Sequence, residues 1–374
     1  MTSTPKAVYE LGQSLWYDNI ERRLLENGEL AAMIERGDIY GVTSNPSIFK
    51  KAISDSNDYD DDLKPLAAEG LSAIEIFDRL AIEDIQNACD LFSGVYTATK
   101  GGDGYVSIEV NPDLAHDADA TCREAQRLWD TVDRPNLMVK IPATKAGLPA
   151  IQRSIANGLN INITLIFSQE RYAEVVEAYI AGLEQRAAKG AGIENIASVA
   201  SFFVSRIDSK VDAWLQDIVQ QEGPHAGKAA SLQGKIAIAN AVMAYQLFRV
   251  KFEGDRFSAL RENGARVQRP LWASTSTKNP EYPDTLYIDE LIGGETVNTV
   301  PPDTLEAFKD HGTARLTLEK DVDGARQVLA DLEEVGLSLA KATKELEDEG
   351  VAAFSKAFSD LLHSVEDRRA EAVG

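Results

Sequence analysis

Short apolar runs rich in β-branched residues recur through the first 300 positions, and each is followed by an amphipathic stretch. Each run also ends in a polar residue or in a Gly/Pro cluster. Eight runs predict strands, at 14–19, 39–44, 105–111, 137–143, 161–167, 197–204, 270–275 and 285–289. Eight strands separated by helices predict an α/β fold with a closed parallel sheet, the (β/α)8 or TIM barrel.

Two helical regions are expected in addition to the barrel. Between the second and third predicted strands, apolar residues at 74, 77, 81, 85, 88 and 91 keep three- and four-residue spacing, which predicts a long helix. The same spacing over 322–332 and 351–365 predicts C-terminal helices that pack back. No Pro/Ser-rich linker divides the chain. We therefore expect one domain over 1–374, with barrel strands over about 14–289 and a helical extension over about 314–374.

The charge of the chain narrows the choice of partners. Its 374 residues include 38 Lys+Arg against 60 Asp+Glu, a formal net charge of −22. So acidic a surface repels phosphate backbones and anionic lipids, which argues against nucleic acid and membranes as partners. The sequence has no run of about 18 apolar residues and no signal-peptide pattern, so a cytoplasmic location is expected. The oligomeric state stays open between a monomer and a homodimer.

The motifs indicate neither a metal nor an organic cofactor. The four histidines, at 116, 225, 311 and 363, lie outside the predicted strand ends without metal-ligand spacing, and no phosphate-binding glycine motif opens a helix after a strand. Cys89 and Cys122 lack a Cys-x-x-Cys spacing and are expected to be reduced packing residues. Carbon–carbon chemistry without a cofactor needs an electron sink made by the protein, and a Schiff-base lysine supplies one.

Lys140 lies in the apolar strand LMVKIPAT, where a solvated lysine is out of place. Burial favours a neutral amine, which can attack a carbonyl. From this run alone, a lysine that faces outwards from an edge strand is the alternative. In a barrel, one parity of each strand points inward, and chemistry is found at the carboxyl-end mouth. Polar residues in phase on two other strands favour the interpretation of Lys140 as a buried amine that faces the barrel interior. They are Ser107, Glu109 and Asn111 on the third predicted strand, and Asn160, Asn162 and Thr164 on the fifth.

The ends of the other predicted strands add hydroxyl, amide and charged groups. These are Asp18, then Thr43, Ser44 and Asn45, then Ser201 and Arg206, and finally Ser274, Ser276 and Lys278. Each taken alone is open to a structural interpretation, as a helix N-cap or a surface ion pair. Arg206 opens a predicted helix and is a candidate phosphate ligand, and a salt bridge to Asp208 or to a neighbouring helix is its alternative.

Five ordered segments resemble the signatures of the transaldolase family, in its longer actinobacterial form. They are GVTSNPSIF at 41–49, YVSIEVNP at 105–112, NLMVKIPAT at 136–144, GLNINITLIFS at 158–168 and SVASFFVSRID at 198–208. The similarity extends over about 10–300. It implies that Lys140, on the fourth strand, is the Schiff-base lysine. It also implies that Glu109 and Thr164 hold and activate a catalytic water, and that Asp18 is the acid/base at the substrate's C4 hydroxyl.

The same resemblance implies which residues bind substrate. Asn45, Thr43, Asn162 and Ser201 are implied to bind sugar hydroxyls, and Arg206 to bind phosphate. Shorter members of the family carry an arginine where this chain reads ASTSTKNP, which leaves open whether Ser274 and Lys278 take part in phosphate binding. The implied reaction moves a dihydroxyacetone unit from sedoheptulose 7-phosphate to glyceraldehyde 3-phosphate, giving erythrose 4-phosphate and fructose 6-phosphate. It belongs to the non-oxidative pentose phosphate pathway and uses no cofactor.

Two other functions remain as alternatives. An aldolase of the fructose-6-phosphate type shares the fold and the lysine but releases free dihydroxyacetone. Those aldolases resemble one another in a glutamine at the position of Glu109 and a tyrosine at the position of Phe203. A non-catalytic barrel that binds sugar phosphates is the other alternative, and the presence of Lys140, Glu109 and Asp18 argues against it.

Overall fold

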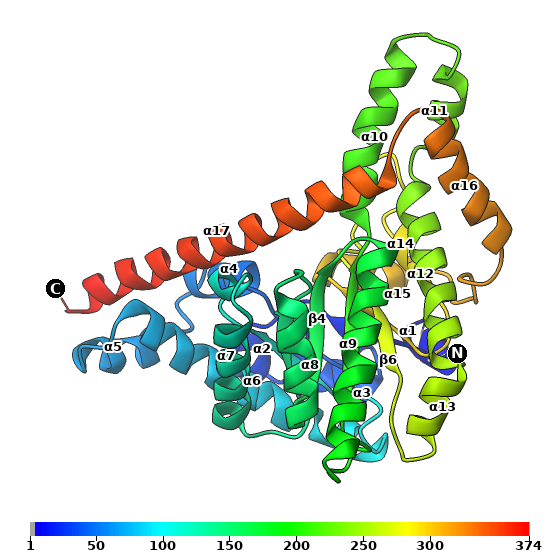
Figure 1. The fold of residues 1–374 in the computed structure, drawn as a ribbon. Coiled ribbons are helices and arrows are strands. Elements are labelled where there is room, and N and C mark those ends of the chain that lie inside the picture. The colour runs from blue at the N-terminus through cyan, green and yellow to red at the C-terminus, as the bar shows by residue number, and fades with distance from the viewer. Residues whose placement is uncertain (1–3, 374) are drawn as a thin grey trace.

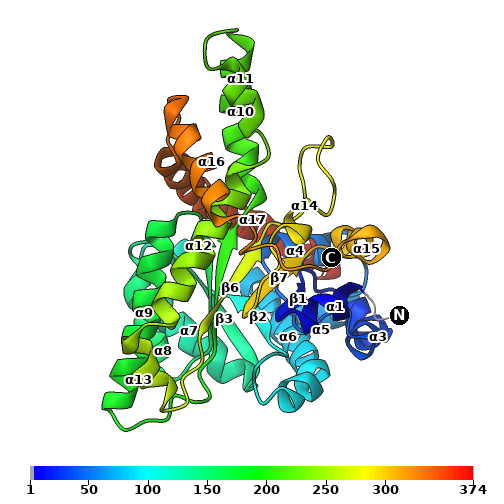
Figure 2. The same cartoon turned by 90° about the vertical axis from the view of Figure 1, so that its right-hand side faces the viewer.

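A parallel sheet of seven strands forms the centre of the molecule in a computed structural model that describes residues 4–373. Its strands are β1 (Gln13–Tyr17), β2 (Val106–Glu109), β3 (Leu137–Pro142), β4 (Ile161–Ile166), β5 (Ser198–Phe203), β6 (Gln268–Ala273) and β7 (Thr296–Val300). They pair in the order β1-β7-β6-β5-β4-β3-β2, and every pairing is parallel. The sheet is strongly curled and is surrounded by helices (Figure 2).

The eighth position of the barrel is filled by Val42, which forms parallel bridges to Tyr17 of β1 and Val106 of β2. Backbone bonds on both sides hold it, with the Val42 N–H donating to Tyr105 O at 2.9 Å and Tyr17 N–H donating to Gly41 O at 2.8 Å. A Cβ on Gly41 would lie 2.7 Å from the Trp16 ring, so this close passage requires glycine. The predicted strand at 39–44 is thus reduced to one bridge, and the predicted (β/α)8 barrel is confirmed.

The predicted strand at 285–289 is wrong, because these residues fall on the short helix α14 (Leu286–Asp289). The strand that closes the barrel is β7, whose sequence TVNTV is fully buried between β1 and β6. A short apolar run such as LYI fits a buried helical turn as well as a strand. Asn298 interrupts the apolar pattern of β7, which is why the sequence did not predict this strand. Inside the fold, the Asn298 side chain accepts a hydrogen bond from Thr275. The barrel strands therefore span 13–300 instead of 14–289.

Helices account for most of the remaining chain. They are α1 (Thr4–Glu10), α2 (Arg22–Glu26), α3 (Glu29–Arg36), α4 (Pro46–Ser54), α5 (Asp60–Ala68), α6 (Ala73–Ala98), η1 (Pro112–Leu114), α7 (Ala118–Val132), α8 (Gly147–Asn157), α9 (Gln169–Ala188), α10 (Ser205–Gln220), α11 (Ala226–Leu232), α12 (Ile236–Phe252), α13 (Asp255–Arg261), α15 (Pro302–His311), α16 (Val322–Glu334) and α17 (Leu339–Val373). The predicted helix between the second and third strands is α6, and the two predicted C-terminal helices are α16 and α17.

Helix α17 crosses the barrel at the carboxyl ends of the strands (Figure 1). It packs on α4, α5 and α6 on one side and reaches β4 and α10 on the other. With 35 residues it is about 50 Å long at 1.5 Å per residue, enough to span the mouth. None of the helices between residues 4 and 373 combines the length and the apolar character needed to cross a membrane.

Candidate active site

A cavity of about 150 Å³ opens at the carboxyl ends of the strands. Phe203, Ala273, Ser276, Thr299, Pro301 and Phe354 form part of its wall. The remaining wall consists of predicted site residues, namely Asp18, Thr43, Asn45, Lys140, Thr164, Ser201, Arg206, Ser274 and Lys278. Parallel strands bring their carboxyl ends to one edge of the sheet, which is why side chains far apart in sequence meet here.

Lys140 and Glu109 lie side by side, because β2 and β3 pair with these two residues in register. Both side chains are nearly buried, with 7% and 5% of their surfaces exposed. Lys140 Nζ donates to Ser44 O at 3.0 Å and lies 3.6 Å from Glu109 Oε2. Strand β3 runs between β2 and β4, so the alternative of an outward-facing lysine on an edge strand is wrong. The amine is held at the cavity with a carboxyl group beside it.

The Glu109 carboxyl is suited to proton transfer near neutral pH. Burial raises its pKa to about 7, and the neighbouring Lys140 opposes this rise only in part. Within residues 4–373, Glu109 Oε2 and Thr164 Oγ1 have no hydrogen-bond partner, although both atoms are buried. Such atoms are costly to bury unless a small polar molecule satisfies them. Both therefore fit the predicted pair that holds a catalytic water.

Irregular backbone accompanies the cavity wall at two points. The register between β4 and β5 shifts between Ile163 and Ile166, and Leu165 has a positive φ of 60° directly after Thr164. Ser274, which follows β6, has a φ of 57°. A positive φ is strained for residues other than glycine, and such strain persists only where surrounding structure imposes it. At both points the strained backbone comes directly after a regularly paired stretch of strand and sets the direction of the side chains there.

Asp18 follows β1 and is oriented by Thr43, whose hydroxyl donates to Asp18 Oδ1 at 2.6 Å. Thr43 Oγ1 also lies 2.5 Å from the hydroxyl of Thr299, a residue of β7. Burial raises the pKa of Asp18, while the Thr43 hydrogen bond and the charges of Lys140 and Lys278 lower it. The hydroxyl of Thr43 is thus occupied in holding the Asp18 carboxyl.

Asn162 is fully buried behind the cavity wall and is not among the residues that line it. Its Oδ1 accepts from Ser201 Oγ at 2.7 Å, and its Nδ2 donates to Ser107 Oγ at 3.0 Å. Asn162 therefore fixes the Ser201 hydroxyl, which does line the cavity. Asn45 lines the cavity while its Oδ1 caps α4 by accepting from Ile48 N at 3.0 Å.

Two cations face the cavity without a carboxylate partner among the described residues. The Arg206 guanidinium lies over the Phe203 ring at 5.1 Å, and burial lowers its pKa. Its predicted alternative, a salt bridge to Asp208, is not formed, because Asp208 accepts from Ala237 N and from the Tyr287 hydroxyl, both at 2.8 Å. Among residues 4–373, Lys278 Nζ hydrogen-bonds only to Ser276 Oγ, at 2.7 Å, and burial lowers its pKa, as does the neighbouring charge of Arg206. Two adjacent unpaired cations in an otherwise acidic protein have the chemistry that an anion-binding site requires.

Sequence reasoning missed three contributors to this site, and it did not foresee how a fourth, Ser44, takes part. Ser44 acts through its backbone carbonyl, which no side-chain pattern reveals. Thr299 lies on the strand that was not predicted, and Ser205 bonds Ser274 Oγ at 2.9 Å from the first turn of α10. Phe354 comes from α17, where its spacing is that of an ordinary core stripe. A stripe of this kind carries no signal that one of its members reaches a functional cavity.

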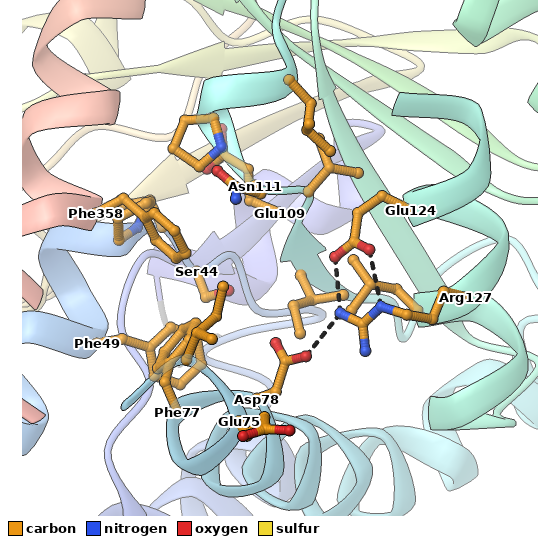
Figure 3. Close-up of a pocket in the computed structure, with 18 residues that line it drawn as sticks. Ser44, Phe49, Glu75, Phe77, Asp78, Glu109, Asn111, Glu124, Arg127 and Phe358 are labelled. Atoms are coloured by element: carbon orange, nitrogen blue, oxygen red, sulfur yellow. Dashed lines mark hydrogen bonds and ion pairs between the residues drawn. The ribbon is translucent and has the colours of Figure 1, made fainter. Parts of the chain in front are cut away.

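A second cavity of about 300 Å³, whose lining Figure 3 shows, lies beside the first. Asn45 lines both, and Glu109 belongs to the wall of the second. Its other walls carry Phe49, Phe77 and Phe358, together with an ion cluster in which Arg127 lies 2.8 Å from Asp78 and 2.7 Å from Glu124. This cavity is larger, but its cation is neutralised and Lys140 is not in its wall. Lys140 and the two unpaired cations make the smaller cavity the candidate active site.

Comparison with known proteins agrees with this arrangement. The family model described as Transaldolase/Fructose-6-phosphate aldolase matches residues 15–365. The chain is 46% identical over 365 residues to a transaldolase of Trichodesmium erythraeum, with 96% of each chain covered. It is 47% identical over 366 residues to a transaldolase of Thermobifida fusca, with 98% of each covered, and 46% identical over 361 residues to one of Mycolicibacterium smegmatis, with 96% of each covered.

Proposed function

The chain belongs to the transaldolase/fructose-6-phosphate aldolase family, and we propose that its transaldolase reaction runs through a Schiff base on Lys140. The enzyme is a transferase of the pentose phosphate pathway, which passes a dihydroxyacetone unit from a ketose phosphate to an aldose phosphate. The observation that carries the proposal is the buried pair of Lys140 and Glu109, in which Lys140 lines a cavity with two unpaired cations.

Imine formation uses the groups of β2, β3 and β4. The neutral Lys140 amine attacks the ketose carbonyl at C2 and forms a carbinolamine. The protonated form of Glu109, which is populated near pH 7 because its pKa is raised to about 7, donates its proton to the departing hydroxyl through a water held with Thr164, so that water leaves and the C=N bond forms. Glu109 is left as a carboxylate beside the cationic imine, and their attraction stabilises both charges.

Carbon–carbon cleavage uses Asp18. Its carboxylate takes the proton of the C4 hydroxyl, the C3–C4 bond breaks, and the electron pair moves into the imine to give an enamine. The C4 hydroxyl becomes the carbonyl of the departing aldose phosphate. The acceptor aldehyde then enters, the enamine carbon attacks it, and Asp18 returns the proton to the new hydroxyl. Thr43 keeps the Asp18 carboxyl in position through both half-reactions.

The phosphate of donor and acceptor is bound by Arg206 and Lys278 in this proposal, with Ser274 nearby. Ser201 and Asn45 offer a hydroxyl and an amide to the sugar, and Asn162 and Thr43 position Ser201 and Asp18. Lys278 thereby takes the place of the arginine that shorter relatives carry in this segment. Phosphorylated sugars are the proposed partners, and neither nucleic acid nor a membrane surface is proposed, in keeping with the net charge of −22.

The proposal extends to the organisation and location of the chain. One domain is supported by α17, which packs on helices from both sides of the barrel. A cytoplasmic location is supported by the substrates, because charged sugar phosphates do not cross a bilayer unaided. Whether the protein is a monomer or a homodimer stays a prediction for size-exclusion chromatography with light scattering.

Arg206→Ala is expected to raise KM for fructose 6-phosphate about 10- to 100-fold, because it removes charge-assisted hydrogen bonds worth roughly 1.5–3 kcal/mol. The KM for unphosphorylated fructose should change little. Steady-state kinetics with both donors measures the difference, and Lys278→Ala should give a smaller effect in the same direction. An equal rise for both donors would assign Arg206 to structure instead of phosphate binding.

Borohydride trapping with fructose 6-phosphate tests the whole proposal. A three-carbon adduct on Lys140, diminished by erythrose 4-phosphate while sedoheptulose 7-phosphate appears, is the expected result. Peptide mass analysis locates the adduct. An adduct accompanied by steady release of free dihydroxyacetone would identify an aldolase, and the absence of any adduct would contradict the Schiff-base mechanism.

A further inference from the structure

Phe354 is the one residue after Pro301 among those that line the active cavity within the described chain. It lies in the middle of α17, a helix outside the βα units of the barrel, and only 7% of its surface is exposed. The cavity it faces also contains Asp18, Lys140 and Arg206. Phe354 belongs to the hydrophobic core, and its position in the cavity wall also brings its ring to these polar groups.

Ion pairs on both sides of Phe354 hold α17 over the mouth. Towards its N-terminus, Lys210 of α10 pairs with Glu345 at 2.8 Å and Glu349 at 2.7 Å. Towards its C-terminus, Asp360 pairs with Lys50 of α4 at 3.2 Å, and Arg368 pairs with Asp60 of α5 at 2.9 Å. Helix α17 is therefore supported at both ends, by α10 towards its N-terminus and by α4 and α5 towards its C-terminus (Figure 1).

A glycine lets this segment approach the barrel closely. Gly350 precedes Phe354 by one turn, and a Cβ there would lie 3.1 Å from Leu165 Cδ2. Leu165 is the positive-φ residue that follows Thr164 on β4. A helix interior disfavours glycine by about 1 kcal/mol relative to alanine, and close contact with the barrel accounts for this one.

The next turn of α17 shows what an ordinary packing phenylalanine looks like in the same helix. Phe358 makes an edge-on contact with Phe77, with the ring centroids 5.9 Å apart, and Phe77 makes another with Phe49, with the centroids 5.6 Å apart. These rings lie in the wall of the second cavity (Figure 3). Phe354 has no aromatic neighbour of this kind among the described residues. Phe358 thus anchors the helix, whereas Phe354 faces the reacting groups.

We propose that Phe354 determines the fate of the enamine, by excluding water from the three-carbon unit on Lys140 until the acceptor aldehyde binds. The inference rests on the proposed Schiff-base mechanism and assigns a role to the C-terminal helix in it. The competing route is hydrolytic: the enamine carbon takes a proton, water adds to the imine carbon, and the C–N bond breaks. Free dihydroxyacetone and the Lys140 amine result, with one water consumed. An apolar ring over the cavity disfavours the entry of that water.

The test compares the fates of one intermediate in matched variants of the full-length enzyme. Fructose 6-phosphate serves as donor and erythrose 4-phosphate as acceptor, and the ratio of free dihydroxyacetone to sedoheptulose 7-phosphate is measured. Phe354→Ala should raise this ratio at least tenfold. Phe354→Leu keeps an apolar side chain and should give a smaller rise. Phe358→Leu, one turn away in the second cavity, should leave the ratio within twofold of wild type.

Borohydride trapping keeps this inference separate from the mechanism on which it rests. If the Lys140 adduct forms in wild type and in Phe354→Ala while the ratio stays constant, the role of Phe354 is overturned and the mechanism stands. If no adduct forms in wild type, the mechanism itself fails. An equal rise in Phe358→Leu would overturn the inference by showing that any loosening of α17 admits water. Thermal unfolding shows whether Phe354→Ala is folded. If it is not, the product ratio of Phe354→Leu tests the inference in its place.

Discussion

Lys140→Ala is expected to reduce turnover about 10⁴-fold or more, because without the amine no imine can form and no electron sink exists. The fold should survive, since within residues 4–373 the only hydrogen bond of the Lys140 amine is to the backbone oxygen of Ser44. Far-UV circular dichroism and thermal unfolding would establish that the variant is native. A coupled assay for transfer and mass analysis after borohydride treatment would measure the loss.

Lys145→Ala is the matched control for this variant. Lys145 follows β3 by three residues and is exposed, so the same substitution removes an amine that the mechanism does not use. It should retain wild-type turnover and the borohydride adduct. Wild-type transfer by Lys140→Ala, or an adduct that persists in it, would move the nucleophile to another residue and remove the mechanism proposed above.

Glu109→Gln is expected to slow imine formation and hydrolysis about 10²- to 10³-fold, because the amide hydrogen-bonds but does not transfer a proton. Substrate binding should be nearly unchanged. In the wild-type enzyme the acid form of Glu109 drives loss of water, so this step should weaken as the pH rises through about 7. Rapid-quench trapping over a pH series measures the step, and the inflection near pH 7 should be missing in Glu109→Gln. Identical profiles in both proteins would refute the role.

The raised pKa of Glu109 also predicts how the free energy of unfolding depends on pH. Its pKa is raised from 4.5 to about 7 in the folded protein, so between these values the native state binds more protons than the unfolded state. The contribution of Glu109 to the free energy of unfolding is therefore present below about pH 4.5 and is lost as the pH rises through about 7. Glu109→Gln should lack this loss and gain stability relative to wild type at pH 8. Glu124→Gln, in the wall of the second cavity, is the control for changing a carboxyl group in this part of the protein.

The site contains two unpaired cations and, close to them, two buried carboxyl groups. Arg206 and Lys278 supply unpaired positive charge where a phosphate is expected, while Asp18 and Glu109 have pKa values raised by burial. An anion bound by the cations would lower their mutual repulsion, and it would leave the two carboxyl groups free for proton transfer.

The sequence by itself determined most of the barrel and the identity of the central residues. Local periodicity encodes which face of an element is buried, so six strands, the long helix α6 and the C-terminal helices were predictable. Lys140 and Glu109 were identifiable because each interrupts an apolar strand, and their side-by-side position follows from parallel pairing in register. The spacing also indicated that Asp18, Thr164 and Arg206 lie at the same end of the barrel.

Only the tertiary structure decided how the barrel closes and what each polar group contacts. The strand between β1 and β6 must pair with both, and the segment that does so is TVNTV, not the run at 285–289. Between β1 and β2, the predicted strand at 39–44 forms only a bridge at Val42. The tertiary structure also turned Asn162 towards Ser201 instead of the cavity. Phe354 reaches the site from a helix nearly 200 residues beyond Lys140 in the chain. Such contacts depend on the relative placement of distant elements, and that placement is fixed by the packing of the whole core, which no local pattern records.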